Sequence, residues 1–240
     1  MKIVRNVLLI ILAILLVSSI ALYVAGNNMY KEALDGETLE DVIDEIRSDP
    51  DYIKYEDLPQ NYINAVIAVE DHRFREHGAI DFIAICRAIY VNVTSFSLRE
   101  GGSTITQQVA KNIFYITEEN PVTRKIAEII TAFDLEDKYT KDEIVELYVN
   151  TIYFGDGYYG IEAACQGYLG KSTTEMTLAD CTMMAGIPNA PSVYAPTVNP
   201  DLTRDRQEKV IADMVEYGYL SEEDSNTLIS SLDIYYEIFE

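Results

Sequence analysis

Cysteine is scarce in this chain of 240 residues, and the few cysteines it has exclude two common kinds of small fold. Cys86, Cys165 and Cys181 are odd in number and stand in apolar surroundings. They form neither a disulfide framework nor a set with the spacing of metal ligands. We therefore predict that all three are small buried side chains.

Proline and glycine are also few, at 7 and 12 residues, while 48% of the chain is hydrophobic. This composition excludes a disordered protein and is typical of one or two globular domains. Alternating strand patterns are scarce, and we find no internal repeat or low-complexity linker. The sequence therefore predicts a mainly α fold.

Positively charged residues are also scarce. The chain has 18 Lys and Arg against 40 Asp and Glu, which gives a formal net charge of −22. A chain this acidic is a poor partner for nucleic acid. The cations are concentrated, however, in residues 70–128, which hold seven of them against eight carboxylates. These seven are Arg73, Arg75, Arg87, Arg99, Lys111, Arg124 and Lys125. The concentration indicates either chance with salt bridges or an anionic ligand held by this segment.

One long run without charge occupies residues 7–25. As a helix its 19 residues reach about 28 Å, which matches one hydrocarbon core. Lys2 and Arg5 precede the run, so the positive-inside tendency places residues 1–6 in the cytoplasm and the rest of the chain outside. A cleaved signal peptide would have a shorter apolar region and a small residue where Tyr23 stands. We therefore expect an uncleaved, single-pass anchor.

Beyond the anchor, apolar spacing and capping signals predict one helix after another. Thr104 with Gln107, and Thr140 with Glu143, have the spacing of capping boxes. The expected helices cover 58–69, 81–91, 124–138, 160–169, 176–186, 202–217 and 221–231, with two more that begin at 104 and 140. The segments 153–160 and 187–196 are expected to be loops. We divide the chain into a juxtamembrane segment (26–44), one domain (45–217) and a C-terminal helix with a tail (218–240).

The first candidate for chemistry is Glu70, which ends an apolar helix and is followed by Asp71 and Arg73. Burial raises the pKa of a carboxyl group and nearby cations lower it, and this balance is how a general base is tuned. The alternative is a solvated helix end.

The second candidate is the stretch "GGSTITQQVAKN" at 101–112. Its two glycines let the backbone approach a ligand closely, and its hydroxyls and free N–H groups stand at a helix start, where anions bind. Gln107, Gln108, Lys111 and Asn112 exceed what capping needs, so we favour a ligand site over an ordinary capped helix.

The third candidate is "RKIAE" at 124–128, in which Glu128 stands one helical turn from Arg124 and Lys125. It is either a surface ion pair, worth about 0.2–0.5 kcal/mol, or a carboxylate fixed beside cations. Two carboxylates on separate helices with cations between them suggest glycosyl chemistry. The tyrosine-rich segment 153–160 is either a sugar-facing loop or a turn packed by aromatic rings.

Five motifs in order resemble the peptidoglycan glycosyltransferases of glycosyltransferase family 51, over about residues 45–217. They are "EDHRFREHGAID", "GGSTITQQVAKN", "RKIAE", "KDEIVELYVN" and "YFGDGYYGIEAACQGYLGK". The resemblance implies a lysozyme-like helical domain with a membrane-hugging subdomain. It implies lipid II as substrate, β-1,4-linked glycan strands as product, and release of undecaprenyl pyrophosphate. No S-x-x-K or K-T-G motif occurs, so we expect the monofunctional branch without a transpeptidase domain.

The resemblance also implies roles for individual residues. Glu70 matches the catalytic base, which takes the proton of the acceptor sugar's 4-hydroxyl. Glu128 matches a second essential carboxylate that orients Lys125 or other cations, or assists the pyrophosphate or a metal. The residues expected to bind substrate are Asp71, Arg73, Phe74, His77, Gly78, Ser103, Thr104, Gln107, Gln108, Lys111, Asn112, Arg124 and Lys125.

The sequence departs from the family pattern where relatives often carry basic residues, near Asn120 and at Ala127. A divalent cation, Mg²⁺ or Mn²⁺, is our hypothesis for offsetting these missing charges, although no cofactor is required for certain and no metal ligand is assigned. The expected partners are lipid II, the growing lipid-linked glycan, the cell membrane and other cell-wall synthesis proteins. Two alternatives stay open, a membrane-anchored scaffold that binds lipid II without catalysis and a lysozyme-like enzyme that cleaves glycan.

Overall fold

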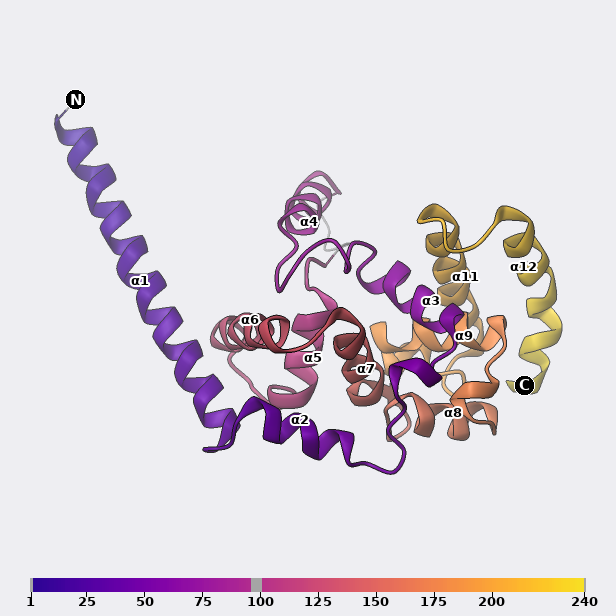
Figure 1. Ribbon diagram of the computed structural model, residues 1–240. Coiled ribbons are helices and arrows are strands. Elements are labelled where there is room, and N and C mark those ends of the chain that lie inside the picture. Colours follow the sequence, from indigo (N-terminus) through magenta and orange to yellow (C-terminus); the bar gives the residue numbers. More distant parts are fainter. Residues whose placement is uncertain (1, 96–100, 240) are drawn as a thin grey trace.

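The computed structural model describes residues 2–95 and 101–239 and is built almost entirely of helices (Figure 1). Arg99, one of the seven clustered cations, lies outside the described residues. The α-helices are α1 (Lys2–Leu34), α2 (Leu39–Arg47), α3 (Gln60–Glu70), α4 (Phe82–Ser95), α5 (Ile105–Phe114), α6 (Pro121–Lys138), α7 (Lys141–Thr151), α8 (Ile161–Leu169), α9 (Leu178–Gly186), α10 (Pro191–Tyr194), α11 (Pro200–Glu216) and α12 (Glu222–Tyr236). Short 3-10 helices cover Tyr55–Asp57, Thr173–Glu175, Ile187–Asn189 and Glu237–Phe239. The mainly α prediction is confirmed.

The segment 153–160 was wrongly predicted as a loop, because it contains a small antiparallel hairpin. Strand β1 (Tyr153–Gly155) pairs with β2 (Tyr158–Tyr159), with Tyr153 opposite Tyr159. The connection is tight because Gly155, Asp156 and Gly157 all have positive φ. The segment 187–196 likewise contains a 3-10 helix and α10 rather than only irregular chain.

Helix α1 is longer than the uncharged run that predicts it. Among the described residues it is the one helix that is long and apolar enough to cross a membrane. Its residues up to Val24 are exposed, but Gly26 and Tyr30, beyond that run, are buried against the domain. The juxtamembrane segment 26–44 therefore consists of the end of α1 and the start of α2, which Thr38 caps with a complete capping box.

The core lies where α3, α5, α7, α9 and α11 meet. Its largest fully buried side chains include Tyr62, Tyr115, Tyr148, Phe74 and Phe154. Helix α3 packs on α9 and α11, while α5 packs on α6 and α7. This arrangement places the carboxyl end of α3 beside the amino-terminal half of α5, and these two ends carry the first two motifs.

Local signals explain most of the helix boundaries. Thr140 and Glu143 form the expected capping box at the start of α7. Thr104 caps α5 by accepting a hydrogen bond from the backbone of Gln107, but the Gln107 side chain is used elsewhere. Helix α6 begins earlier than predicted, because Asn120 caps it and Pro121 occupies its first position.

Helix α4 stands apart from the rest of the domain in Figure 1 and keeps much of its apolar surface exposed. The exposed apolar side chains on it are Phe82, Ile83, Ile89, Tyr90 and Val93. Cys86 lies on the same helix and is exposed, which makes the prediction of three buried cysteines wrong at this position. Cys86 is exposed because α4 packs only part of its surface on the domain. Cys165 and Cys181 are buried, as predicted.

Candidate active site

Glu70 ends α3 with its carboxyl group almost completely enclosed, since the side chain is 10% exposed. Its Oε2 accepts a hydrogen bond of 2.8 Å from Nε2 of Gln108 on α5. Its Oε1 is buried and has no hydrogen-bond partner among the described residues. Burial raises the pKa of Glu70, and the hydrogen bond from Gln108 and the charge of Arg206 offset this only in part. The result is a carboxyl group with one oxygen free of hydrogen bonds and a pKa above the ordinary value.

Arg206, on α11, is a residue of this site that the sequence reasoning missed. Its Nη2 lies 3.8 Å from Oε1 of Glu70, and its side chain is 14% exposed. Its Nε donates to the carbonyl of Gly186, and its guanidinium lies 5.9 Å from the ring centre of Tyr194. Nothing in the local pattern of α11 marks this arginine, because its partner stands 136 positions earlier in the chain.

Asp71 ties the end of α3 to the start of α5. Its Oδ2 accepts the backbone N–H of Ile105 at 3.1 Å, and its Oδ1 lies 2.8 Å from Nε2 of His77. The other ring nitrogen of His77 lies 2.6 Å from the carbonyl oxygen of Gly78. Burial works against the charged imidazole, but the contacts with Asp71 and Gly78 raise the pKa of His77 overall. Both ring nitrogens face acceptors, which favours the protonated form.

Asp81 ties the start of α4 to the loop that follows Glu70. Its Oδ1 accepts the backbone N–H groups of Ile83 and Ala84, and its Oδ2 contacts Nε of Arg73 at 3.1 Å. Burial opposes ionisation here, but these backbone hydrogen bonds lower the pKa of Asp81 overall. Arg73 is therefore engaged within the loop that follows Glu70.

Two buried polar side chains at the start of α5 hold the same loop by hydrogen bonds. The hydroxyl of Thr104 and the side-chain amide of Gln107 both donate to the carbonyl of Ala79, at 3.1 and 2.9 Å. Both residues are almost fully buried. They therefore fix the turn between α3 and α4, and through it the first motif, rather than offer free surface to a ligand.

The second carboxylate, Glu128 on α6, sits between two cations. Its Oε2 contacts Nζ of Lys125 at 3.0 Å and its Oε1 contacts Nε of Arg124 at 3.3 Å. Lys125 also donates to the hydroxyl of Ser103 at 2.9 Å. The "RKIAE" motif is thus more than a surface ion pair, because Glu128 is buried and Ser103 links the cluster to the loop before α5.

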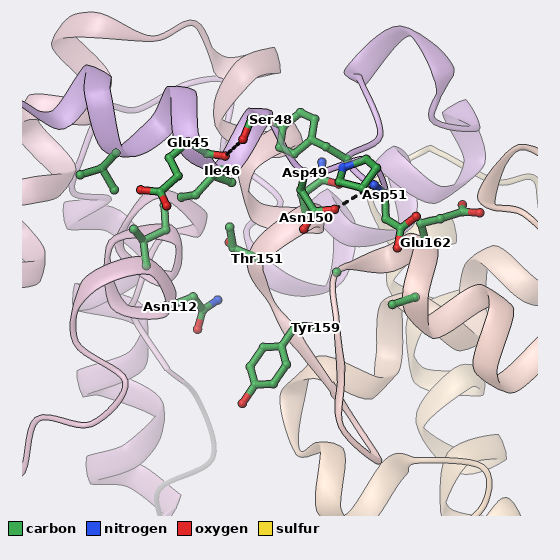
Figure 2. Close-up of a pocket in the computed structure, with 16 residues that line it drawn as sticks. Glu45, Ile46, Ser48, Asp49, Asp51, Asn112, Asn150, Thr151, Tyr159 and Glu162 are labelled. Carbon is green, nitrogen blue, oxygen red and sulfur yellow. Dashed lines mark hydrogen bonds between the residues drawn. The ribbon is translucent and has the colours of Figure 1, made fainter.

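The remaining predicted residues fall in three different settings. Lys111 is exposed on α5. Phe74 is fully buried beneath Nζ of Lys141, which lies 4.2 Å from its ring centre, so it supports the site by packing and offers no surface to a substrate. Asn112 lies with its side chain in a pocket of about 690 Å³ shown in Figure 2. Neither Glu70 nor Glu128 lines that pocket.

Asp71, His77 and Asp81 are close enough to hold a metal ion, since one ligand atom from each lies within 4.8 Å of the others. Both carboxylates and both imidazole nitrogens, however, already contact the partners named above. We therefore interpret this group as a hydrogen-bonded junction of α3, α4 and α5. The contact of Arg73 with Asp81 and of the Ile105 backbone with Asp71 disfavours a resident metal ion at this junction.

Two short linkages thus bring the predicted residues together. Gln108 on α5 holds Glu70, and Ser103, just before α5, holds the Lys125–Glu128 pair. The helix start that carries the hydroxyls and the glutamines therefore bridges the two carboxylates. Such an arrangement can accept a proton at Glu70 and stabilise negative charge near Lys125.

Part of this sequence is similar to known proteins. The pattern of the family described as Transglycosylase matches residues 35–215. A Cupriavidus necator protein named as a transglycosylase is 42% identical over 181 residues, which is 75% of this chain and 78% of that protein. Penicillin-binding protein 1A of Pseudomonas aeruginosa is 43% identical over 179 residues (75% of this chain, 21% of that protein). Penicillin-binding protein 1F of Bacillus subtilis is 41% identical over 175 residues (73% and 24%).

The chain spans only about a fifth to a quarter of the length of these penicillin-binding proteins. The crystal structure of penicillin-binding protein 1A from Haemophilus influenzae aligns with 74% of this chain and 17% of its own, at 24% identity and a TM-score of 0.45. The family match covers most of the chain, including both carboxylates and the helix between them. On this basis the chain belongs to the transglycosylase family.

Proposed function

We propose that this glycosyltransferase polymerises lipid II into β-1,4-linked glycan strands and releases undecaprenyl pyrophosphate. The observation that carries the proposal is the enclosed carboxyl group of Glu70, whose pKa is raised and whose Oε2 is held by Gln108, while Oε1 accepts no hydrogen bond from the described residues. Membership of the transglycosylase family and an enclosed carboxyl group with a raised pKa together favour a role for Glu70 in taking a proton from a sugar hydroxyl.

In the proposed reaction, Glu70 accepts the proton of the acceptor's 4-hydroxyl. The oxygen attacks the anomeric carbon of the donor, and the bond from that carbon to the pyrophosphate oxygen breaks, with inversion at the anomeric centre. The pyrophosphate leaves with the bonding electron pair, so it needs positive charge nearby rather than a strong acid. The exposed Lys111, with Arg124 and Lys125, supplies cations from α5 and α6.

We assign Glu128 the task of orienting these cations. Its two oxygens are already paired with Arg124 and Lys125, so a direct role in proton transfer is not favoured. A divalent cation, Mg²⁺ or Mn²⁺, brought in with the pyrophosphate is part of this proposal, because the basic residues expected near Asn120 and Ala127 are absent. Removal of divalent ions with a chelator is expected to lower the polymerisation rate, and an unchanged rate would remove the metal from the proposal.

The membrane is the second proposed partner. The apolar part of α1 would span it, with residues 1–6 in the cytoplasm and the domain on the outer face. The exposed apolar side chains of α4 fit a surface that lies against lipid. A lipid-linked donor and acceptor would then reach Glu70 without leaving the bilayer. Association with other cell-wall synthesis proteins stays a prediction.

The experiment that tests the proposal is polymerisation of purified lipid II by the wild type and by Glu70→Gln, with glycan product separated by size. We expect product from the wild type and none from the variant. Product from both would contradict the role of Glu70. No product from either, with lipid II still bound, would favour the non-catalytic scaffold, and cleavage of preformed glycan would favour the lysozyme-like alternative.

A further inference from the structure

The anchor helix α1 continues past the end of its apolar run and meets α6. The apolar run ends at Ala25, and the next residue, Gly26, is already buried. Tyr30, one turn later on the same face, is buried as well. Figure 1 shows the lower part of α1 beside α6, while its upper part projects away from the domain.

Gly26 permits an unusually close approach of the two helices. A Cβ atom at this position would lie 2.5 Å from Cγ2 and 2.9 Å from Cβ of Ile126, and 3.1 Å from the backbone nitrogen of Ala127. Glycine inside a helix is destabilising relative to alanine. The close contact with α6 explains why a glycine stands here.

Polar contacts fix the same interface further along α6. The hydroxyl of Tyr30 donates to Asp134, and burial and this contact raise the pKa of Tyr30, so the hydroxyl keeps its proton. Lys138 lies 3.8 Å from Asp134 and contacts Glu40 on α2 at 2.8 Å. The end of α1 and the start of α2 therefore hold α6 from one side.

The opposite side of α6 carries Glu128, the second carboxylate of the candidate active site. Ile126 lies between Lys125 and Glu128 in the chain, and at about 100° per residue Glu128 is roughly 200° around the helix from it. Helix α6 is consequently clamped between the anchor on one face and α5 with its preceding loop on the other.

We propose that Gly26 and Tyr30 are positioning residues for glycosyl transfer. They dock the membrane anchor on α6 and so hold the Lys125–Glu128 pair in a fixed place relative to the bilayer and to Glu70. The role rests on the proposed function, because the reaction it serves is the polymerisation of a lipid-linked sugar. The anchor then acts as part of the catalytic scaffold and not only as a tether.

The test uses the full-length chain in lipid bilayers and measures kcat and KM for lipid II. Gly26→Ala forces α1 away from α6, and since a displacement of about 1 Å can cost about 10²-fold in rate, we expect kcat to fall about 10-fold or more with little change in KM. Tyr30→Phe keeps the ring and removes the hydrogen bond, and we expect a smaller fall in kcat. Tyr23→Phe is the matched control, because Tyr23 is exposed within the apolar run, and it should behave as the wild type.

A second substitution separates positioning from simple loss of folding. Ile126→Ala removes the atom 2.5 Å from the new Cβ, although the Cβ atom at 2.9 Å remains. The addition of Gly26→Ala to Ile126→Ala should therefore lower kcat by a smaller factor than Gly26→Ala does in the wild type, with a residual defect because the Cβ atom of residue 126 and the backbone nitrogen of Ala127 remain close. Melting curves are measured for every variant, and the expected result is a kcat defect in Gly26→Ala with a wild-type melting temperature.

Two results would overturn the inference while leaving the proposed function intact. One is a wild-type kcat in Gly26→Ala. The other is a loss of activity that follows a lower melting temperature and changes kcat and KM alike, which would mean that the contact only stabilises the fold. A wild type that forms no glycan overturns the proposed function, and with it this role.

Discussion

Glu70 and Gln108 are joined by a hydrogen bond of 2.8 Å that links the last residue of α3 to the interior of α5. The bond commits one carboxylate oxygen and leaves the other buried without a hydrogen bond, 3.8 Å from Nη2 of Arg206. Because the two residues are 38 positions apart in the chain, the state of the carboxyl group depends on how α3 and α5 pack.

Replacement of Glu70 by glutamine should separate activity from stability. General acid–base groups typically contribute about 10²–10⁴-fold to the rate, so we expect at least a hundredfold loss of polymerisation by Glu70→Gln. Burial raises the pKa of Glu70 in the folded protein. At a pH above the ordinary glutamate pKa, ionisation of Glu70 therefore lowers the free energy of unfolding. The variant should accordingly melt at the same or a higher temperature than the wild type at pH 7. Glu119→Gln, at an exposed position, is the control, and a large drop in melting temperature for Glu70→Gln alone would contradict this reading.

The acid limb of the pH–rate profile should report the same carboxyl group. We expect kcat/KM to rise with pH through a midpoint above that of an ordinary glutamate, because Glu70 must be ionised to accept a proton. Gln108→Leu removes the hydrogen bond that lowers the pKa of Glu70, so it should move the midpoint to higher pH. An acid limb that stays in place in this variant would mean that another group titrates.

The junction at His77 should make folding stability depend on pH. The pKa of His77 is raised in the folded protein by its contacts with Asp71 and Gly78, which outweigh burial. Its contribution is therefore fully present below the unfolded pKa of about 6.5 and is lost as pH rises through the higher folded value. His77→Gln should lower the free energy of unfolding by about 2 kcal/mol at pH 6 and by less at pH 9. Denaturant titrations at both pH values measure this, and an equal loss at both would show that the charge of His77 does not matter.

Lys125 should act on the leaving group more than on binding. Lys125→Met keeps most of the length of the side chain but removes the ammonium group that contacts both Glu128 and Ser103. Removal of one such electrostatic group typically costs about 10²–10³-fold in kcat, and we expect a fall of this order. Lys54→Met, at an exposed position, is the matched control. A variant with normal kcat and only a raised KM would assign Lys125 to substrate binding instead.

The helices were predictable because their signals are local. Thr140 with Glu143 marks the start of α7, and the uncharged run at 7–25 marks the anchor, from a few neighbouring residues each. The hairpin at 153–160 was not predictable in this way, since its strands are too short for an alternating pattern. Helix α6 starts at Pro121, earlier than predicted, because the Asn120 side chain caps its first turn and proline is favoured at the first helical position.

Within the candidate site, the sequence named both carboxylates but not their surroundings. It placed Phe74 and Asn112 among substrate-binding residues, whereas packing buries the first and directs the second into a pocket that neither carboxylate lines. It gave no sign of Arg206, whose guanidinium reaches Glu70 only because α11 packs on α3. Cys86 was predicted to be buried from its apolar neighbours, but those neighbours are themselves exposed on α4.

The sequence by itself predicted a membrane anchor, the helical class and the candidate reactive groups, because these predictions follow from local spacing, charge and motif order. Only the tertiary structure decided that Glu70 is enclosed, that Gln108 and Arg206 flank it, and that Gly26 brings the anchor against α6. These properties arise from contacts between residues far apart in the chain. The energies of these contacts depend on burial and close packing between helices, which a local sequence pattern does not predict.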